Sequence, residues 1–329
     1  MEVRLAVLPH HLTTREPAAM ATLLLATRVY TFMPGVGVPG SGREIARAAK
    51  GSASYRRLVE SWGWSLPLWN QGVVASAIDG DDAASDARAV WERLERDERF
   101  AALRLFLRPA MADDLPAYLE KLASDVLKGG PDPAYSVPMA AALDRFATRH
   151  GLGVSRAEAV SVAQRAEEAL GETLASVVVP VLLQSDARRI SLARERLAPE
   201  LSAVRGAVAS LIEGRASPGL RSAAAAYTAA FEASLPELTA DQREDEARVV
   251  AGAVRLSFGR YPSDAALVSS ANAASRLTPG LGLRVGGDKA GEPGVPAVYD
   301  PVAAGRFTGM TVRVVARSAG RSGALRAGR

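Results

Sequence analysis

The sequence predicts a mainly α-helical protein whose multi-helix, bundle-like body carries a few short β-strands. Alanine is abundant and aromatic residues make up only 5% of the chain, a composition that favours helices in close contact. Apolar residues recur at helical spacing in several segments, and residues typical of helix N-caps precede them. We expect the first and last strands to pair and to bring the termini together.

The N-terminal region, residues 1–80, combines a strand, a helix, a Gly/Pro loop and a tryptophan cluster. Residues 2–8 alternate polar and apolar before turning apolar, which predicts a short strand. Thr13 and Thr14 offer an N-cap for a helix that has Pro17 in its first turn. This helix would run past the leucine run that ends at Leu25.

The central region, residues 81–277, predicts an α-helical body. Val90 and Leu94 belong to an apolar stripe at helical spacing, and Glu92 precedes Arg96 by four residues on the outer face. The pattern indicates an amphipathic helix that packs one face and exposes the other.

Heptad-like apolar spacing between residues 190 and 211 is interrupted by Pro199. This predicts two helices that meet at the proline, or one kinked helix. Ser217 and Pro218 then begin a helix with apolar residues on one face, namely Leu220, Ala224, Tyr227 and Phe231.

Two other segments of the body have signals of their own. Ser155 and Glu158 are spaced as a capping box, which predicts a helix to about Leu170. The apolar run of residues 177–183 suits a buried strand or a buried helical turn, and Pro180 argues against a central position in a sheet.

The C-terminal region, residues 278–329, predicts a Gly/Pro-rich segment, a strand over residues 310–316 and a basic arm. Residues 251–329 carry 11 basic and 4 acidic side chains, a net charge of +7, whereas residues 51–250 carry 23 and 29, a net charge of −6. No acidic residue follows Asp300. The arginines of the arm are Arg306, Arg313, Arg317, Arg321, Arg326 and Arg329.

This charge asymmetry predicts a contact with an anionic partner. Because arginine supplies nearly all the basic residues, the composition is typical of a GC-rich bacterial genome. The leading hypothesis is a non-enzymatic subunit of a bacterial multi-protein assembly, which contacts other subunits or copies of itself through the arm. The alternative partner of the arm is DNA or RNA.

Three of the four tryptophans lie within eight residues, at Trp62, Trp64 and Trp69. They predict a packed staple of the core, or an interface anchor. A platform that stacks on bases or sugars is the further alternative.

A glycine-rich loop precedes a helix pattern and approaches the sequence of phosphate-binding loops. The residues that would hold phosphate are Gly35, Gly37, Gly40, Gly42 and Arg43. Arginine replaces the usual lysine, and a glutamate stands in place of the magnesium-binding hydroxyl. The loop therefore offers a phosphate-binding enzyme or switch as an alternative function, and a simple connector as the other interpretation.

The residue inventory excludes several kinds of chemistry. With no cysteine the chain forms no disulfide or thiolate metal site, and its three histidines suit neither a metal cluster nor an acid–base pair. We therefore expect no catalytic residue, metal or cofactor. The N-terminus lacks the pattern of a signal peptide and the longest apolar runs are too short to span a bilayer, so we expect a cytoplasmic protein.

Overall fold

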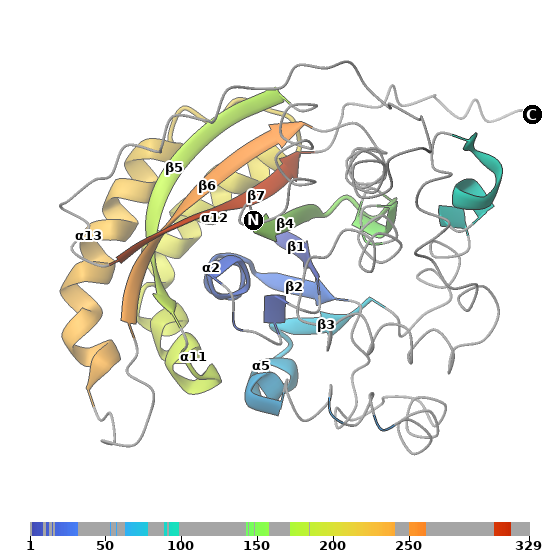
Figure 1. Ribbon diagram of the computed structural model, residues 1–329. Coiled ribbons are helices and arrows are strands. Elements are labelled where there is room, and N and C mark those ends of the chain that lie inside the picture. The colour runs from blue at the N-terminus through green and yellow to red at the C-terminus, as the bar shows by residue number, and fades with distance from the viewer. Residues whose placement is uncertain are drawn as a thin grey trace, which may run out of the picture.

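The computed structural model shows a curved sheet with helices packed on it (Figure 1). The part of the chain that it describes comprises residues 2–8, 11–12, 15, 17–31, 53, 57, 63–77, 89–90, 92–98, 143, 145–147, 149–157, 172–183, 185–240, 250–260 and 306–316.

Seven strands form one mixed sheet in the order β3-β2-β1-β4-β7-β6-β5. The four strands from β3 to β4 are mutually parallel. β7 runs antiparallel to β4 and parallel to β6, and β5 completes the sheet antiparallel to β6. The strand bounds are β1 Arg4–Val7, β2 Arg28–Thr31, β3 Val74–Ser76, β4 Gly153–Ala157, β5 Glu172–Leu183, β6 Val250–Arg260 and β7 Arg306–Ala316.

The expectation of a mainly helical, bundle-like fold is wrong, because the described part contains a four-stranded parallel sheet flanked by helices, an α/β arrangement. Three strands lie between residues 153 and 260, in the stretch expected to be a helical body. The expected pairing of the first and last strands is also wrong, since β4 lies between β1 and β7. Helical spacing is a local signal, whereas strand pairing depends on distant segments, and this explains both errors.

Several local expectations are confirmed. β1 forms at residues 4–7, and helix α2, Pro17–Leu25, begins at its proline. Residues 310–316 lie in β7. The apolar run around Pro180 is the strand β5, and it occupies the edge of the sheet, where a proline costs no ladder hydrogen bond.

The helices after β5 also follow their sequence signals. Pro199 stands in the first turn of α12, so α11 and α12 are two helices that meet at Leu197. The expected apolar face of α13 is buried, including Tyr227 and Phe231. The capping box at Ser155 is different, because residues 155–157 belong to β4. The helix bounds are α11 Ala187–Arg196, α12 Ala198–Ile212 and α13 Leu220–Thr239.

The helices α2, α11, α12 and α13 lie on one side of strands β5 to β7 (Figure 1). On that side, Val179 of β5 and Phe258 of β6 are buried in the core. The short elements η1, Gly63–Ser65, and α5, Leu66–Asn70, lie against α11 on the same side, where Gln71 accepts a hydrogen bond of 2.8 Å from the Ser191 hydroxyl. This face contains most of the hydrophobic core.

The other side of the sheet is covered near β1 and β2. The ring of Phe146 lies 6.2 Å from the ring of Tyr30, and Arg4 donates a hydrogen bond of 3.2 Å to the carbonyl of His150. These contacts come from a helical segment that immediately precedes β4. The parallel half of the sheet is thus packed on both faces, as in doubly wound folds.

Candidate anion site at the carboxyl edge of the parallel strands

All four parallel strands end at one edge of the sheet, because the register aligns Val7 with Thr31 and Ser155, and Thr31 with Ser76. The chain adds β2 and β3 on one side of β1 and then returns to add β4 on the other side. In open α/β sheets this reversal leaves a crevice between the loops that follow the two central strands, and ligands bind there. Here the reversal falls between β1 and β4.

The loop after β1 is tightly organised. The N–H of His11 donates a hydrogen bond of 3.1 Å to the carbonyl of Leu8, and the imidazole is fully buried. The indole of Trp64 donates to the carbonyl of Leu12 over 3.2 Å. The guanidinium of Arg15 lies over the Trp64 ring, 4.8 Å from its centroid. An aromatic ring thus supports a cation at the carboxyl end of β1.

The backbone of Arg15 is unusual, with a φ of 54°, whereas every other described residue with positive φ is a glycine. An L-residue in this left-handed region carries a cost of about 1–2 kcal/mol. The conformation lets the chain turn from β1 into α2 within a few residues. Arg15 therefore stands two residues before the first residue of α2.

The start of α2 favours negative charge. The first turn contains no acidic side chain, and the N–H groups of that turn have no partner within the helix. The aligned peptide dipoles place partial positive charge at this end. Arg15 adds a positive charge close to this end, and Glu16, the residue directly before Pro17, adds a negative charge. The N–H groups of the first turn are the part of this end that suits an anion.

The opposite end of α2 is held by two arginines. Arg194 of α11 donates to the carbonyls of Leu23 and Ala26, both over 2.6 Å, with longer contacts to Leu24 and Thr27. Arg205 of α12 donates to the carbonyl of Leu25 over 2.8 Å, with longer contacts to Leu24 and Ala26. We call these two side chains the arginine clamp of α2.

The arginine clamp is charged at neutral pH although it is largely buried. Burial lowers the pKa of Arg194 to about 10, and the neighbouring charge of Arg205 adds to the effect. Burial likewise lowers the pKa of Arg205. Among the described residues neither arginine forms an ion pair with a carboxylate. The carbonyls at the end of α2 take that role, so the two cations offset the negative end of the helix dipole.

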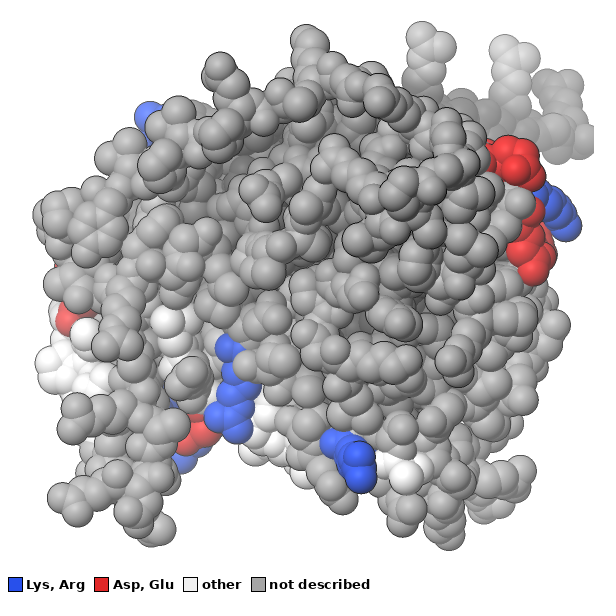
Figure 2. Space-filling model, in the orientation of Figure 1, with Lys and Arg blue, Asp and Glu red and all other residues white. Residues whose placement is uncertain are grey.

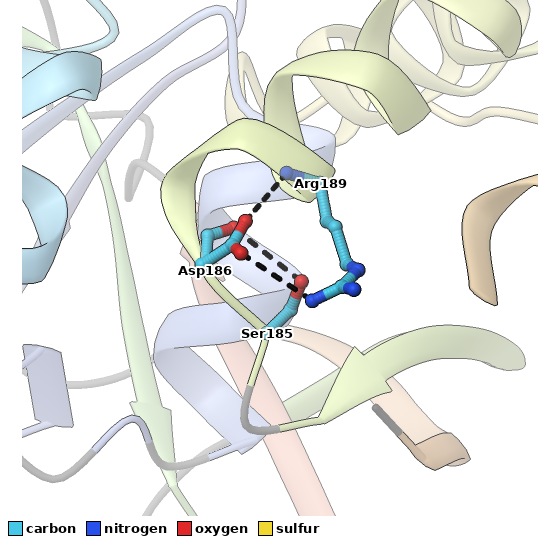
Figure 3. A network of polar contacts seen from close by, with 3 residues as sticks. All are labelled: Ser185, Asp186 and Arg189. Carbon is cyan, nitrogen blue, oxygen red and sulfur yellow. Dashed lines mark hydrogen bonds and ion pairs between the residues drawn. The ribbon is translucent and has the colours of Figure 1, made fainter. Parts of the chain in front are cut away.

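Helix α11, which supplies Arg194, has a well-formed N-cap (Figure 3). Asp186 accepts a hydrogen bond of 2.8 Å from the N–H of Arg189. The guanidinium of Arg189 also reaches the Asp186 carboxylate over 3.3 Å, and the Ser185 hydroxyl donates to the carbonyl of Asp186 over 3.4 Å. This cap fixes where α11 begins, and hence where Arg194 meets α2.

Two buried hydroxyls lie on or beside the strand ends. Ser155 of β4 accepts a hydrogen bond of 2.5 Å from Thr22 of α2, so the helix and the strand are tied together next to the reversal. The hydroxyl oxygen of Thr31, the last residue of β2, is buried and has no hydrogen-bond partner among the described residues. Buried polar atoms are normally paired, so Thr31 offers a binding group at the carboxyl edge.

The expected phosphate loop, Gly35 to Gly42 with Arg43, lies outside the described residues. In the sequence, Gly35 follows Thr31, the last residue of β2, by four residues.

The remaining expected site residues are distributed as follows. Trp64 is half-buried against the loop after β1, whereas Trp69 is buried in α5, where its indole donates to the Ser65 hydroxyl over 3.2 Å. Trp62 lies outside the described residues. In the basic arm, Arg306 and Arg313 belong to β7, inside the sheet. The other arginines of the arm lie outside the described part: Arg317, Arg321, Arg326 and Arg329.

A second group of charged side chains is visible on the surface. Figure 2 shows acidic and basic side chains together at one edge of the molecule, over the helical segment of residues 89–98. Arg96 there pairs with Glu92 over 3.9 Å, as the sequence spacing predicts. A hollow at this segment is lined by both acidic and basic side chains, so it has no strong preference for an anion. Its charged lining residues are Glu92, Arg93, Arg96, Asp97 and Glu98.

Sequence reasoning missed Arg15, Arg194 and Arg205. The clamp has no local signature, because its partners are backbone carbonyls about 170 to 180 residues away. Arg15 had a usable signal, since a basic residue between an N-cap and a first-turn proline stands at a helix N-terminus.

Comparisons with protein-family models, with curated proteins and with solved structures found no match. Within the described residues, no group of three or more acidic or histidine side chains is arranged to hold a metal ion. In the same part of the chain, no helix combines the length and the apolar character needed to cross a membrane.

Proposed function

We propose that this protein binds a small phosphorylated ligand at the carboxyl edge of the parallel strands, beside the loop that follows β1. The observation that carries the proposal is the parallel order β3-β2-β1-β4, whose reversal falls beside Arg15 and the first turn of α2, which contains no acidic side chain. A phosphate group there would accept hydrogen bonds from the N–H groups that follow Pro17 in this turn and from the arginine.

Two further features support a phosphate. The glycine-rich loop begins four residues after the end of β2 in the sequence, and glycines let backbone N–H groups approach a phosphate closely. The arginine clamp supports the site from a distance, because it compensates the negative end of α2 and leaves the positive end for the ligand.

The test is thermal unfolding of the full chain with ATP, GTP and inorganic phosphate, each with and without magnesium. A ligand present at 100 times its dissociation constant adds about 2.7 kcal/mol to the stability. For a chain of 329 residues we expect the melting temperature to rise by about 4 °C. If none of these phosphates raises it at millimolar concentration, the proposal is wrong.

The matched variant is Arg15→Gly, which removes the guanidinium while glycine accepts the positive φ without strain. We expect this variant to fold and to lose the ligand-induced shift. The control is Arg221→Ala, which removes an exposed arginine from α13 and should leave the shift intact. Equal shifts of the melting temperature in the Arg15→Gly variant and the native chain would show that the ligand binds away from Arg15.

A second candidate function is the non-enzymatic interaction role expected from the basic C-terminal region. The observation that favours it is the net charge of +7 carried by residues 251–329. The native mass of the protein purified from its own host tests this role. A mass equal to that of one chain would count against a stable assembly.

A further inference from the structure

Strand β5 forms one edge of the sheet, and part of that edge has backbone groups that point outward. In an antiparallel pair, successive residues alternate between bonding the neighbouring strand and pointing away from it. Pro180 has no N–H, so it fits a position that points away from β6, and its carbonyl accepts the hydrogen bond from Tyr227. The register with β6 is unbroken between Ser176 and Pro180. The backbone groups of Ser176 and Val178 therefore point away from β6 as well, and no other described strand pairs with them.

The side chains of this edge do not protect it. Natural proteins commonly place charged side chains on edge strands, because an unpaired edge can bind another strand. Residues 173–183 of β5 include no charged residue. Ser176 is exposed, and Val178 is one of two large hydrophobic side chains that are exposed in the described part of the chain. The edge before Pro180 is therefore suited to accept a further strand.

Helix α13 lies beside this edge (Figure 1). Because α12 contacts β7 and α13 contacts β5, α13 is the outermost of these helices, as β5 is the outermost strand. Ala223 of α13 lines a hollow that α13 shares with α12. Arg221 precedes Ala223 by two residues, about 200° around the helix, so it lies on the side away from α12. Glu232 lies about three turns after Arg221 and therefore on the same side.

This outward side of α13 carries one charge of each sign. Arg221 and Glu232 are exposed, and neither forms an ion pair among the described residues. Ala225 and Ala229, which lie between them, are exposed and small, so a second helix could approach closely. A second copy of α13 that runs antiparallel would place each Arg221 beside the Glu232 of the other copy.

We propose that two copies of this chain form a dimer through β5 and α13. A twofold axis perpendicular to the sheet would pair the two β5 strands antiparallel, with Ser176 of each opposite Val178 of the other. Each such pair would exchange two hydrogen bonds. The same axis places the two α13 helices side by side and antiparallel, as their charges require. The hydrogen bond from Tyr227 to Pro180 brings the middle of this part of α13 close to the outward-pointing part of β5, so one axis serves both contacts.

A second copy fits this edge better than an unrelated extended peptide does. A peptide would pair with the strand alone and would leave Arg221 and Glu232 without partners. Specific interfaces bury roughly 1,200–2,000 Å² in total, and a narrow strand edge needs the helix contact to reach this size. Peptide binding to a monomer is therefore an alternative outcome of the test. The proposed contact uses neither the basic arm nor the anion site.

The experiment is sedimentation velocity of the full chain at concentrations from about 1 to 100 μM. The charge variants are Arg221→Glu and Glu232→Arg, measured alone and mixed in equal amounts. The control is Arg188→Glu, which reverses the charge of an exposed arginine on α11. The strand variant is Ser176→Pro, which removes an N–H that points away from β6 and leaves the pairing with β6 intact, as Pro180 does.

We expect the native chain to have twice the mass of one chain, with a dissociation constant below about 10 μM. Each charge variant alone should bind itself at least tenfold more weakly, because both attractive contacts of the dimer become repulsive. Their equal mixture should regain the native affinity, since the two chains then carry opposite charges at both contacts. Ser176→Pro should be monomeric, and Arg188→Glu should keep its affinity within about threefold.

Several results would overturn the proposal. One is a native chain that stays monomeric at about 100 μM, whether or not it binds a peptide. Others are a mixture of the charge variants that associates no better than either alone, a Ser176→Pro variant that dimerises like the native chain, and equal losses in the control and the charge variants. Circular dichroism verifies folding. If Ser176→Pro does not fold, Val178→Lys replaces it, because a charge on the edge opposes strand pairing.

Discussion

The two halves of the sheet are built differently. The half formed by β3, β2, β1 and β4 is parallel and has packed side chains on both faces, with Thr22 on one side and Phe146 on the other. The half formed by β7, β6 and β5 is mixed, and its strands pack on helices through one face. At β5 the other face exposes Ser176 and Val178.

This difference determines what each half can offer a ligand. A parallel sheet that is covered on both faces has only its edge available, and its loops gather at the carboxyl end. We therefore assign the small phosphorylated ligand to the edge of the parallel half. This assignment remains a proposal with its own test.

The largest effect should come from the arginine clamp, because α2 packs against strands of both halves. We expect Arg194→Ala to lower the free energy of unfolding by about 2–4 kcal/mol, since it leaves carbonyls at the end of α2 without a charged donor. Arg205→Ala should cost a similar amount, and urea unfolding measures both. Because the two side chains share the carbonyls of Leu24 and Ala26, their effects should not add.

Arg188→Ala is the control for this experiment, since Arg188 is an exposed residue of the same helix α11. Its cost should stay within about 0.5 kcal/mol. Arg194→Lys retains the charge but not the planar fork, so it should fall between the alanine variant and the native chain. Equal stabilities of the Arg188 and Arg194 variants would show that α2 does not depend on the clamp.

Elements with local signals were predictable from the sequence, and elements that depend on distant partners were not. Pro17 and Pro199 correctly marked the starts of α2 and α12, because a proline constrains its own backbone. The sheet was missed because β7 completes it from about 150 residues beyond β4, and no spacing in the sequence shows that pairing. The strand β4 was mistaken for a helix, since a capping box occurs by chance in a strand.

The candidate site divides in the same way. The glycine-rich loop was found from the sequence, because its residue types are characteristic in themselves. That β2, the strand before this loop, ends at the same edge as β1, the strand before Arg15 and α2, is shown only by the structure. Arg306 and Arg313 were noticed for their charge. Their positions in a strand between β4 and β6 come from the strand register.

The contrast between the two faces of the mixed half can be tested with adjacent valines of β5. Val178 is 43% exposed on the side of β5 away from the helices, whereas Val179 is fully buried on the helix side. We expect Val178→Thr to change the free energy of unfolding by less than about 0.5 kcal/mol. Val179→Thr introduces a hydroxyl into the core and should cost about 1–3 kcal/mol.

Each valine variant serves as the control for the other, because the substitution and the strand are the same and only the face differs. Urea unfolding of the two variants gives the comparison directly. A cost for Val178→Thr as large as that for Val179→Thr would mean that this side of β5 is covered in solution.

The smallest effect concerns the contact between α13 and the edge strand β5. The hydroxyl of Tyr227 donates a hydrogen bond of 3.0 Å to the carbonyl of Pro180, and the side chain is fully buried. We expect Tyr227→Phe to lower the free energy of unfolding by about 1 kcal/mol at pH 8. Because the phenol of Tyr227 can ionise, the stabilisation from this contact depends on pH.

Burial raises the pKa of Tyr227 above its ordinary value of 10.0. In the unfolded chain the phenol ionises near pH 10, while in the folded chain it stays protonated. The contribution of Tyr227 to the free energy of unfolding is therefore complete below pH 10 and shrinks as the pH rises above it.

The lowered pKa of Arg194 acts in the opposite direction in this range, but it is common to the native chain and the Tyr227→Phe variant and cancels in their difference. We thus expect the gap between the native chain and Tyr227→Phe to narrow by about 0.8 kcal/mol between pH 8 and pH 10.5. Urea unfolding at the two pH values measures it, and a constant gap would mean that Tyr227 is not buried against β5 as described.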